Sequence, residues 1–357
     1  MEANSLIIIF TLSFCLYEVK SDDEWLVTSN EHVLDFVNNP ILQPTEVFEW
    51  LLADPTVLIV GRQLHIFANE VFHGILHFTA DLAIPTNFTK QDNVIPFPGS
   101  TRPYALVEDD TIYLFYEQYQ LPLFRTSHIM LRKGKIMIDT LGYATFNWEM
   151  ASTTVLVPEL EWEKIGTRRV GNPFVFYSQS LKEYRMYYSA SSVHLEDSNI
   201  DEPLYLGLAR STNIIGPWER VITDPLSVDV SGLPNHDVLG IGSLKVVKSP
   251  FTNTNQTKFV ALCNLITRNH RNNRTGSTIS LIRSEDEGLS WYDSIAELIP
   301  PVTDNESSWK HAYVYGYDTI QDPTDGSYIL VYYNGRDGWR NGVEAIGVSR
   351  VEVSVLN

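Results

Sequence analysis

The stretch that decides the fold lies near the C-terminus, at His311–Val351, and reads HAYVYGYDTIQDPTDGSYILVYYNGRDGWRNGVEAIGVSRV. It contains three runs rich in Tyr, Val and Ile, at Tyr313–Ile320, Ser327–Tyr333 and Glu344–Val351. β-Branched and aromatic runs bounded by Asp, Gly, Pro and Asn predict strands of an antiparallel meander. Asp325-Gly326, between the first two runs, is a strong hairpin signal. The stretch therefore predicts a three-stranded antiparallel unit.

The same pattern recurs earlier in the chain. Comparable units span Asp54–Ala80, Arg102–Gly134, Gly171–Ser211 and Gly240–Ser284. In most of them the second run carries an aromatic stripe, such as YLFYE or YRMYY. An antiparallel unit of this size that recurs along a chain is typical of a β-propeller. We therefore predict an all-β fold, a five-bladed β-propeller of antiparallel blades with a central pocket, over residues 51–357. Residues 21–50 are expected to form an N-terminal segment that leads into it.

One turn in the fourth unit has a recognisable motif. Ser284–Trp291 (SEDEGLSW) matches the Asp-box hairpin, in which the Asp side chain ties the turn and the Trp packs into the blade. Ser211–Trp218 (STNIIGPW) is related to it. Both motifs predict architecture rather than catalysis. The Asp box also raises a sialidase as a further alternative, although sialidases need an arginine triad and several such boxes.

Composition restricts the partners and the redox chemistry. The 357 residues carry a formal net charge of −18, which argues against a nucleic-acid or anionic-membrane partner. Of the two cysteines, Cys15 lies in the N-terminal apolar block and Cys263 in the run FVALCNLI. The sequence thus predicts no disulfide in the mature chain, and a buried structural thiol at Cys263.

The N-terminus predicts export. Leu6–Leu16 (LIIIFTLSFCL) has the length of a signal-peptide core and is too short for a membrane span. We expect residues 1–20 to be a signal peptide and no membrane association after its cleavage. Four Asn-x-Ser/Thr sites follow, at Asn87, Asn255, Asn273 and Asn305. Together these features predict a glycoprotein that is secreted or located in the lumen of the secretory pathway.

The blade openings carry a family resemblance. Asp54-Pro55 opens the first unit, Arg102-Pro103 opens the second, and LARS…GPWE spans Leu208–Glu219. With five units in a row, the sequence resembles the five-bladed β-propeller glycosidase superfamily, which includes arabinanases, β-xylosidases, invertases, levansucrases and the related mannoside phosphorylases. The resemblance implies three carboxylates in a central pocket. One is a base or nucleophile on blade one, the second orients it from blade two, and the third is a general acid on a later blade.

Three catalytic candidates follow from that resemblance. Asp54 fits the base, and the carboxylate of blade two would fall at Tyr104, which cannot supply it. Asp237 is the first candidate for the acid. Glu117, at the end of YLFYE, is expected to be the acid itself or to supply the charge that Tyr104 lacks. Such a pair suits glycoside hydrolysis, which needs two carboxyl groups on either side of the bond.

A second set of residues is expected to bind substrate. Their side chains are hydrogen-bonding or aromatic groups at predicted blade openings or loops, and the aromatic ring suits the apolar face of a sugar. The set is Arg102, Tyr104, Asn172, His236, His311, Asp318, Arg336, Asp337 and Trp339. In some relatives a histidine on the last blade helps to hold a central metal ion. A calcium ion near His311 is therefore left open, and we assign no cofactor.

Three functions remain open at this point. The first is a hydrolase of an oligosaccharide or polysaccharide that acts through Asp54 and a second carboxyl group. The second is a glycosidic phosphorylase, which needs a cationic phosphate site for which Arg102, Arg168, Arg169 and Arg336 are candidates. The third is a carbohydrate-binding propeller without catalysis, suggested by Tyr104 and by Asn172, which stands where some members have Asp.

Overall fold

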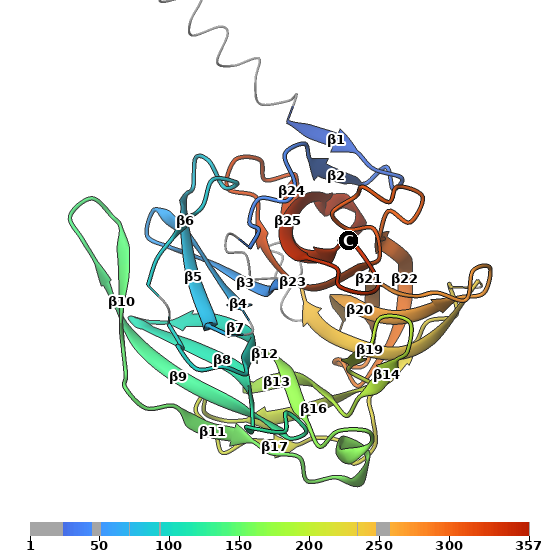
Figure 1. Cartoon of the computed structure of the whole chain (residues 1–357). Coiled ribbons are helices and arrows are strands. Elements are labelled where there is room, and N and C mark those ends of the chain that lie inside the picture. Colours follow the sequence, from blue (N-terminus) through green and yellow to red (C-terminus); the bar gives the residue numbers. More distant parts are fainter. Residues whose placement is uncertain are drawn as a thin grey trace, which may run out of the picture.

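The computed structural model describes residues 24–44, 51–70, 72–92, 94–233, 235–247 and 258–356. These residues form an all-β fold. Its helical content there consists of two short 3-10 helices, η1 (Glu161–Lys164) and η2 (Val353–Leu356). The strands follow one another around a ring, so that the first and the last segments of the chain lie side by side (Figure 1).

The first three antiparallel sheets follow the order of the sequence. The first contains β3 (Leu52–Val60), β4 (Gln63–Glu70), β5 (Gly74–Asp81) and β6 (Thr89–Lys90). The second contains β7 (Ser100–Glu108), β8 (Thr111–Tyr119), β9 (Ser127–Ile138), β10 (Ala144–Trp148) and β11 (Thr153–Leu156). The third contains β12 (Val170–Ser178), β13 (Glu183–Ala190), β16 (Tyr205–Ser211) and β17 (Glu219–Arg220). The hairpin β14 (Val193–Leu195) and β15 (Ile200–Glu202) is inserted between β13 and β16.

The remaining strands form one ten-stranded sheet with two antiparallel runs. One run contains β19 (His236–Val246), β20 (Phe259–Asn269), β21 (Thr275–Ser284) and β22 (Ser290–Ile299), with β18 (Ser227–Asp229) parallel to β22. The other contains β23 (Tyr313–Gln321), β24 (Tyr328–Arg336), β25 (Glu344–Glu352), β2 (Val33–Phe36) and β1 (Trp25–Val27). A single parallel bridge, Ser277 to Tyr313, joins the two runs. The three strands predicted in the C-terminal stretch are confirmed, but Arg336 ends β24 and does not lie in the following loop.

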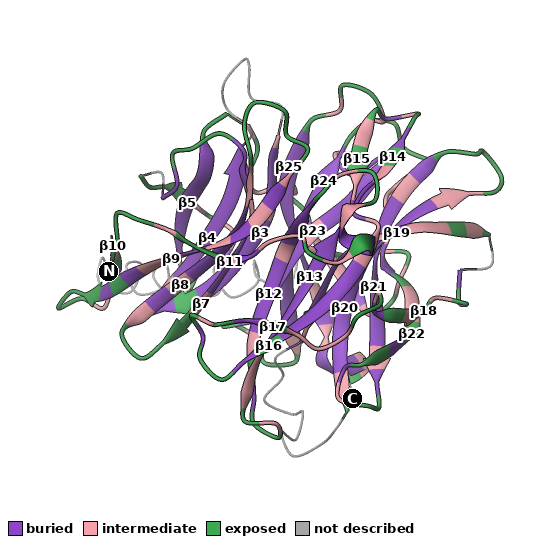
Figure 2. Ribbon diagram, turned by 90° about the horizontal axis from the view of Figure 1, so that it is seen from below, coloured by how far each residue is buried: buried purple, intermediate pink, exposed green. Residues whose placement is uncertain are grey.

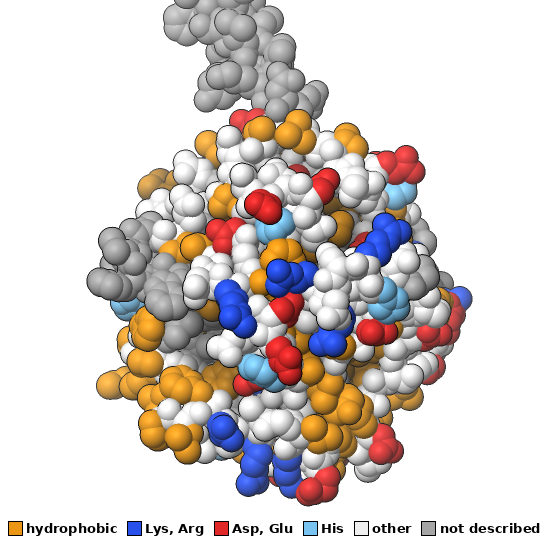
Figure 3. Space-filling model, turned by 45° about the vertical axis from the view of Figure 1, so that its right-hand side comes forward, with side chains coloured by type: hydrophobic (Ala, Val, Ile, Leu, Met, Phe, Trp, Pro, Cys, Tyr) orange, Lys and Arg blue, Asp and Glu red, His pale blue; other side chains and the backbone are white. Residues whose placement is uncertain are grey.

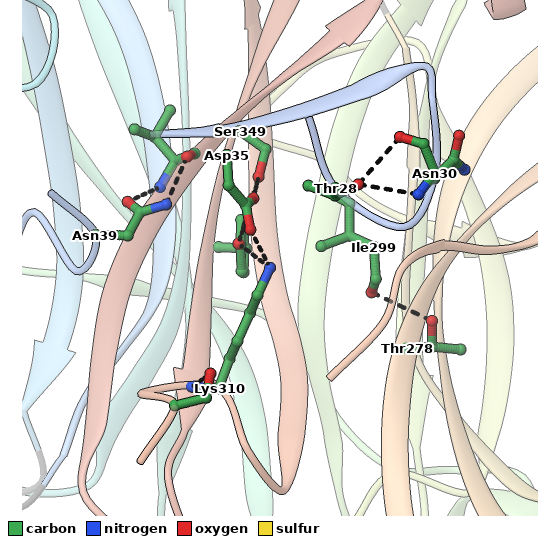
Figure 4. A network of polar contacts seen from close by, with 11 residues as sticks. Thr28, Asn30, Asp35, Asn39, Thr278, Ile299, Lys310 and Ser349 are labelled. Atoms are coloured by element: carbon green, nitrogen blue, oxygen red, sulfur yellow. Dashed lines mark hydrogen bonds and ion pairs between the residues drawn. The ribbon is translucent and has the colours of Figure 1, made fainter. Parts of the chain in front are cut away.

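N-terminal strands complete the last run. β2 pairs with β25, and a partly buried ion pair fixes it there: Lys310 Nζ lies 2.6 Å from Asp35 Oδ2 (Figure 4). The Ser349 hydroxyl also donates to Asp35. Asn39 exchanges two hydrogen bonds of 2.9 Å with the backbone of Val348. The segment expected only to lead into the fold therefore supplies strands to its last sheet.

The core lies between the sheets (Figure 2). The aromatic stripes are buried there, with Phe115, Tyr187 and Tyr188 fully inaccessible. Both faces of these strands are covered, which explains their nearly continuous apolar runs. The Asp-box prediction is confirmed as architecture: Asp286 Oδ1 accepts the Ser290 amide at 2.9 Å, and Trp291 is buried. Cys263 is buried as predicted.

The innermost strand of each sheet or run is irregular at a corresponding position. Asp54, Arg102 and Asn172 have φ values of 51°, 51° and 47°, each before a proline, and Gly316 in β23 has φ 28°. The pairing register shifts at each of these places and also at Gly242 in β19. Such bulges redirect side chains. They turn this set of residues toward the centre of the ring.

Candidate active site

A cavity of about 290 Å³ lies at the centre of the ring, and we call it the central cavity. The innermost strands β3, β7, β12, β19 and β23 all contribute to its lining. Their residues there are Asp54, Arg102, Asn172, Gly242 and Gly316. Since these residues occupy the irregular positions described above, the cavity is a consequence of the bulges.

Four carboxylates line the central cavity: the exposed Asp201, whose Oδ1 lies 2.8 Å from His194 Nδ1, and three others. Asp54 comes from β3, Glu202 from the inserted β14–β15 hairpin, and Glu344 from the start of β25. The buried Asn334 joins two of them. Its Oδ1 accepts the Asp54 amide at 3.2 Å, and its Nδ2 donates to Glu344 Oε2 at 3.3 Å. A single side-chain amide therefore connects the backbone of Asp54 with the carboxylate of Glu344.

Glu344 has the properties of an acid. Burial raises its pKa to about 7, although Arg336 and the hydrogen bond from the Tyr315 hydroxyl lower it. The bond from Arg336 Nη1 is long, at 3.4 Å. A carboxyl group with such a pKa is protonated in a large fraction of molecules near neutral pH, which is what a general acid requires.

The pKa values of Asp54 and Glu202 are raised as well. Burial raises the pKa of Asp54, and Arg102 opposes this effect most strongly. Burial also raises the pKa of Glu202, again against Arg102. The site thus combines these three carboxylates, which raise one another's pKa values, with the cations Arg102 and Arg336, so the titrations of the acids are coupled.

Glu117 has a different environment from the one expected. It does not line the central cavity, and Arg102 Nη1 and Arg169 Nη2 each donate to its Oε2 at 3.1 Å. Ser127 donates to its Oε1 at 2.6 Å. Burial alone would raise its pKa, but Arg169 and Arg102 outweigh burial and the pKa is lowered. Glu117 is therefore a buried counter-ion, which corrects the expectation that it acts as an acid.

Asp237 and His236 also lie away from the central cavity. Asp237 is exposed near the start of β19, where its Oδ1 is 2.9 Å from His270 Nε2. His236 Nε2 is 3.0 Å from Asn269 Nδ2 and lines a second cavity of about 280 Å³. The position of Asp237 gives it no access to a bond held between Asp54 and Glu344, so the expectation of an acid there is corrected.

Two of the three residues expected near blade openings do line the central cavity. Arg102 lines it while donating to Glu117 and Tyr119, and Asn172 lines it while its Nδ2 donates to Gly242 O at 2.7 Å. Tyr104 does not line it: its buried ring packs edge-on against Phe174. Arg102 occupies in β7 the bulge position that Asp54 occupies in β3. The second sheet therefore places a cation in the central cavity where the first sheet places a carboxylate.

Of the five residues predicted in the last unit, only Arg336 lines the central cavity. Asp318 is buried and accepts the Thr56 hydroxyl at 2.7 Å. The other three residues have local contacts. His311 Nδ1 lies 3.1 Å from Val302 O, Asp337 accepts the Val343 amide at 2.7 Å, and Trp339 donates to Thr275 O at 2.7 Å. These three are thus held by structural contacts, and Trp339 lines the second cavity.

Sequence reasoning assigned no site role to Glu344, Glu202, Asn334 or Tyr315. Glu202 follows no motif and reaches the cavity on an inserted hairpin. Asn334 lies in β24 opposite Tyr315 in β23. The signal that could have found them was that both are polar residues within predicted strands. No cluster of three or more metal-ligating side chains occurs among the residues that the structure describes. Within the same ranges, no helix is long and apolar enough to cross a membrane.

No family model matches the sequence, and no curated protein does either. Solved structures do match. An N-acetylgalactosamine deacetylase from F. plautii in complex with blood group B trisaccharide has a TM-score of 0.58 at 12% identity, over 88% of this chain and 97% of that one. An exo-1,5-α-L-arabinanase from a bovine ruminal metagenomic library gives 0.54 at 11%, over 86% and 96%. The α-L-arabinofuranosidase PaAbf62A from Podospora anserina in complex with cellotriose gives 0.54 at 13%, over 87% and 94%. At identities of 11–13%, these likenesses show that the chain shares its fold with these three structures.

Proposed function

We propose that the protein is a glycoside hydrolase that cleaves an oligosaccharide or polysaccharide in the central cavity, with Asp54 as base and Glu344 as acid. The observation that supports the proposal is that the carboxyl groups of Asp54 and Glu344 line one cavity, where Asn334 bonds to the backbone of the first residue and to the carboxylate of the second. Glycan-active enzymes among the structural neighbours support the substrate class. We interpret the three separate sheets and the two runs of the ten-stranded sheet as five blades.

In this proposal Glu344 protonates the leaving-group oxygen and Asp54 takes a proton from the attacking water. Burial raises the pKa of Asp54, and Arg102 opposes that rise and so favours the ionised form that a base requires. Because the acid must be protonated, activity should fall as the pH rises through about 7. Glu202 is the second candidate for the acid, since it lines the same cavity and its pKa is also raised.

The test is a comparison of Asp54→Asn, Glu344→Gln and Glu202→Gln on aryl glycosides and unactivated oligosaccharides. Asp54→Asn should lower kcat on both types of substrate by about 10²–10⁴-fold. Glu344→Gln should lower it by a similar factor on oligosaccharides but much less on aryl glycosides, whose leaving groups need no protonation. Unchanged turnover by Asp54→Asn would exclude the proposal. If Glu202→Gln shows the leaving-group dependence, the acid is Glu202.

A glycosidic phosphorylase is the second candidate function, because Arg102 and Arg336 both line the central cavity. The other two arginines considered for phosphate do not line it: Arg168 is exposed, and Arg169 is buried against Glu117. Turnover that requires inorganic phosphate would favour this function over hydrolysis. Sugar binding without turnover under either condition would favour a carbohydrate-binding propeller.

We also propose that the protein is secreted and glycosylated. Residues 1–20 and Asn255 lie outside the described residues, whereas Asn87, Asn273 and Asn305 are exposed. Exposed asparagines are accessible to carry a glycan. Expression in a secreting eukaryotic cell, followed by N-terminal sequencing and peptide-N-glycosidase treatment, tests both points. Intracellular retention of an unglycosylated full-length chain would contradict them.

A further inference from the structure

An exposed group of apolar side chains lies at the mouth of the central cavity. Phe124 lines the cavity and lies in the loop of residues 120–126. Phe124, Leu121 and Leu123 have relative exposures of 46%, 56% and 75%. Large apolar side chains that are exposed singly need no explanation, but a group of them beside a cavity indicates an interaction surface.

The loop is held in a defined conformation. Its ends are joined by a hydrogen bond of 2.8 Å from Gln120 N to Thr126 O, and Phe124 N donates to Gln120 O at 3.2 Å. Phe124 has φ 51°, which is uncommon for a bulky residue. Its ring is 6.0 Å from that of Tyr119, between centroids. Backbone strain of this kind persists where the surroundings impose it, often at binding sites.

Two arginines flank the apolar tip. The Arg168 amide donates to Arg125 O at 2.9 Å, so the segments around 125 and 168 lie side by side. Both arginines are exposed, and neither forms an ion pair with a described carboxylate. The nearby Glu161 is paired with Lys164 at 2.8 Å. Ile165, close to Arg168 in the chain, adds a further apolar side chain with 47% exposure.

Two exposed arginines thus lie beside exposed apolar side chains in a chain whose net charge is −18. Figure 3 shows one face of the molecule, on which hydrophobic side chains lie among Lys and Arg and among Asp and Glu. We define the apolar–basic patch as Leu121, Leu123, Phe124, Arg125, Ile165 and Arg168. Protruding apolar side chains that can enter a lipid layer, beside cations that can contact phosphates, are the elements of interfacial membrane binding. A soluble polyanion would attract the arginines but would give the protruding aliphatic tips no apolar phase.

We propose that the apolar–basic patch docks the protein on an anionic phospholipid surface, with the central cavity facing that surface. Since Phe124 belongs both to the patch and to the cavity wall, a docked molecule would present its cavity to glycans carried by the lipid layer. This last step rests on the proposed function, whereas the docking itself does not. The net charge of −18 predicts no binding to an anionic membrane. The docking departs from that prediction because binding depends on the charge of the residues at the contact.

Vesicle co-sedimentation of the purified protein tests the docking. Vesicles of phosphatidylcholine with phosphatidylglycerol should bind it, and vesicles of phosphatidylcholine alone should bind it weakly. Leu123→Ser should lower the partition coefficient by about tenfold. Arg125→Gln and Arg168→Gln should each lower it by about fivefold. The matched control is Leu141→Ser, an equally accessible leucine with 65% exposure in the turn between β9 and β10, which should have no effect.

The outcomes separate this inference from the proposed function. Asp54→Asn should bind vesicles as the unmodified protein does, even if it hydrolyses nothing. Hydrolysis of soluble glycosides without vesicle binding would overturn the docking and leave the function intact. Binding that depends on the arginines but not on Leu123 would also overturn it, in favour of an acidic protein or other soluble polyanion. If Leu141→Ser weakens binding as much as Leu123→Ser, the contact lies elsewhere.

Discussion

Glu117 and Glu344 are both buried carboxylates near the centre of the ring, yet their proton affinities are displaced in opposite directions. Glu117 is contacted by Arg102, Arg169 and Ser127, and its pKa is lowered. Glu344 has one cation at 3.4 Å, and its pKa is raised to about 7. Burial favours the neutral form in both cases. The difference shows that the number and the closeness of the partners decide whether a buried carboxylate serves as a counter-ion or as an acid.

The largest expected effect is the loss of the counter-ion. Glu117→Gln leaves Arg102 and Arg169 buried without their shared charge, and should lower the free energy of unfolding by about 3–5 kcal/mol. Chemical denaturation at neutral pH measures it. Glu161→Gln, which removes an exposed ion pair with Lys164, is the control and should change little. A Glu117→Gln variant as stable as the unmodified protein would show that Glu117 is not held as a counter-ion.

The second effect concerns the pH dependence of stability. The pKa of Glu344 is raised from 4.5 to about 7 on folding, so the folded state binds more protons than the unfolded state between these values. The contribution of Glu344 to the free energy of unfolding is fully present below pH 4.5 and is lost as the pH rises through about 7. The whole loss amounts to about 3 kcal/mol. Glu344→Gln should lack this loss and be relatively more stable above pH 7.

Unfolding free energies at several pH values compare the two proteins. Both contain His65 and His77, whose pKa values burial lowers to about 4 and 3, and whose neutral forms stabilise the fold at higher pH. Because that contribution is common to both proteins, the difference between the two curves isolates Glu344. Parallel curves from pH 4 to pH 9 would contradict the raised pKa.

A smaller effect should follow from removing one partner of Glu117. Ser127→Ala deletes the hydroxyl that donates to Oε1 at 2.6 Å, and should cost about 2 kcal/mol because the acceptor is charged and buried. The thermal midpoint and the urea midpoint should both fall. In Ser127→Ala, Glu117 keeps its ion pairs with Arg102 and Arg169. If this variant lost as much unfolding free energy as Glu117→Gln does, the arginines would contribute less than their geometry indicates.

The smallest effect concerns Asn334, which we regard as a positioning residue. Asn334→Ala removes the hydrogen bond that favours the ionised form of Glu344, so the pKa of Glu344 should rise further, by about one unit. In the proposed mechanism the alkaline limb of kcat/KM then moves to higher pH. A purely structural role would lower stability and leave the limb in place. Asn334→Asp, which keeps an acceptor for the Asp54 amide, is the companion variant.

Much of the fold was predictable, because strands depend on local patterns. The runs at Tyr313–Ile320, Ser327–Tyr333 and Glu344–Val351 contain their own alternation and turn residues, and all three became strands of the last unit. The Asp box likewise depends on residues within one turn. The pairing of β2 with β25 was not predictable, since it joins the two ends of the chain.

The candidate site was predictable only in part. The sequence by itself determined the repeated strands, the Asp54-Pro55 opening and the polar side chains available to a central cavity. Tertiary structure alone decided which carboxyl groups meet there and in which protonation state. Glu117 and Glu344 look alike in sequence, because their difference comes from Arg169 and Arg102 on one side and a single distant Arg336 contact on the other. Proton affinity depends on charges brought together by folding, and a local pattern does not contain them.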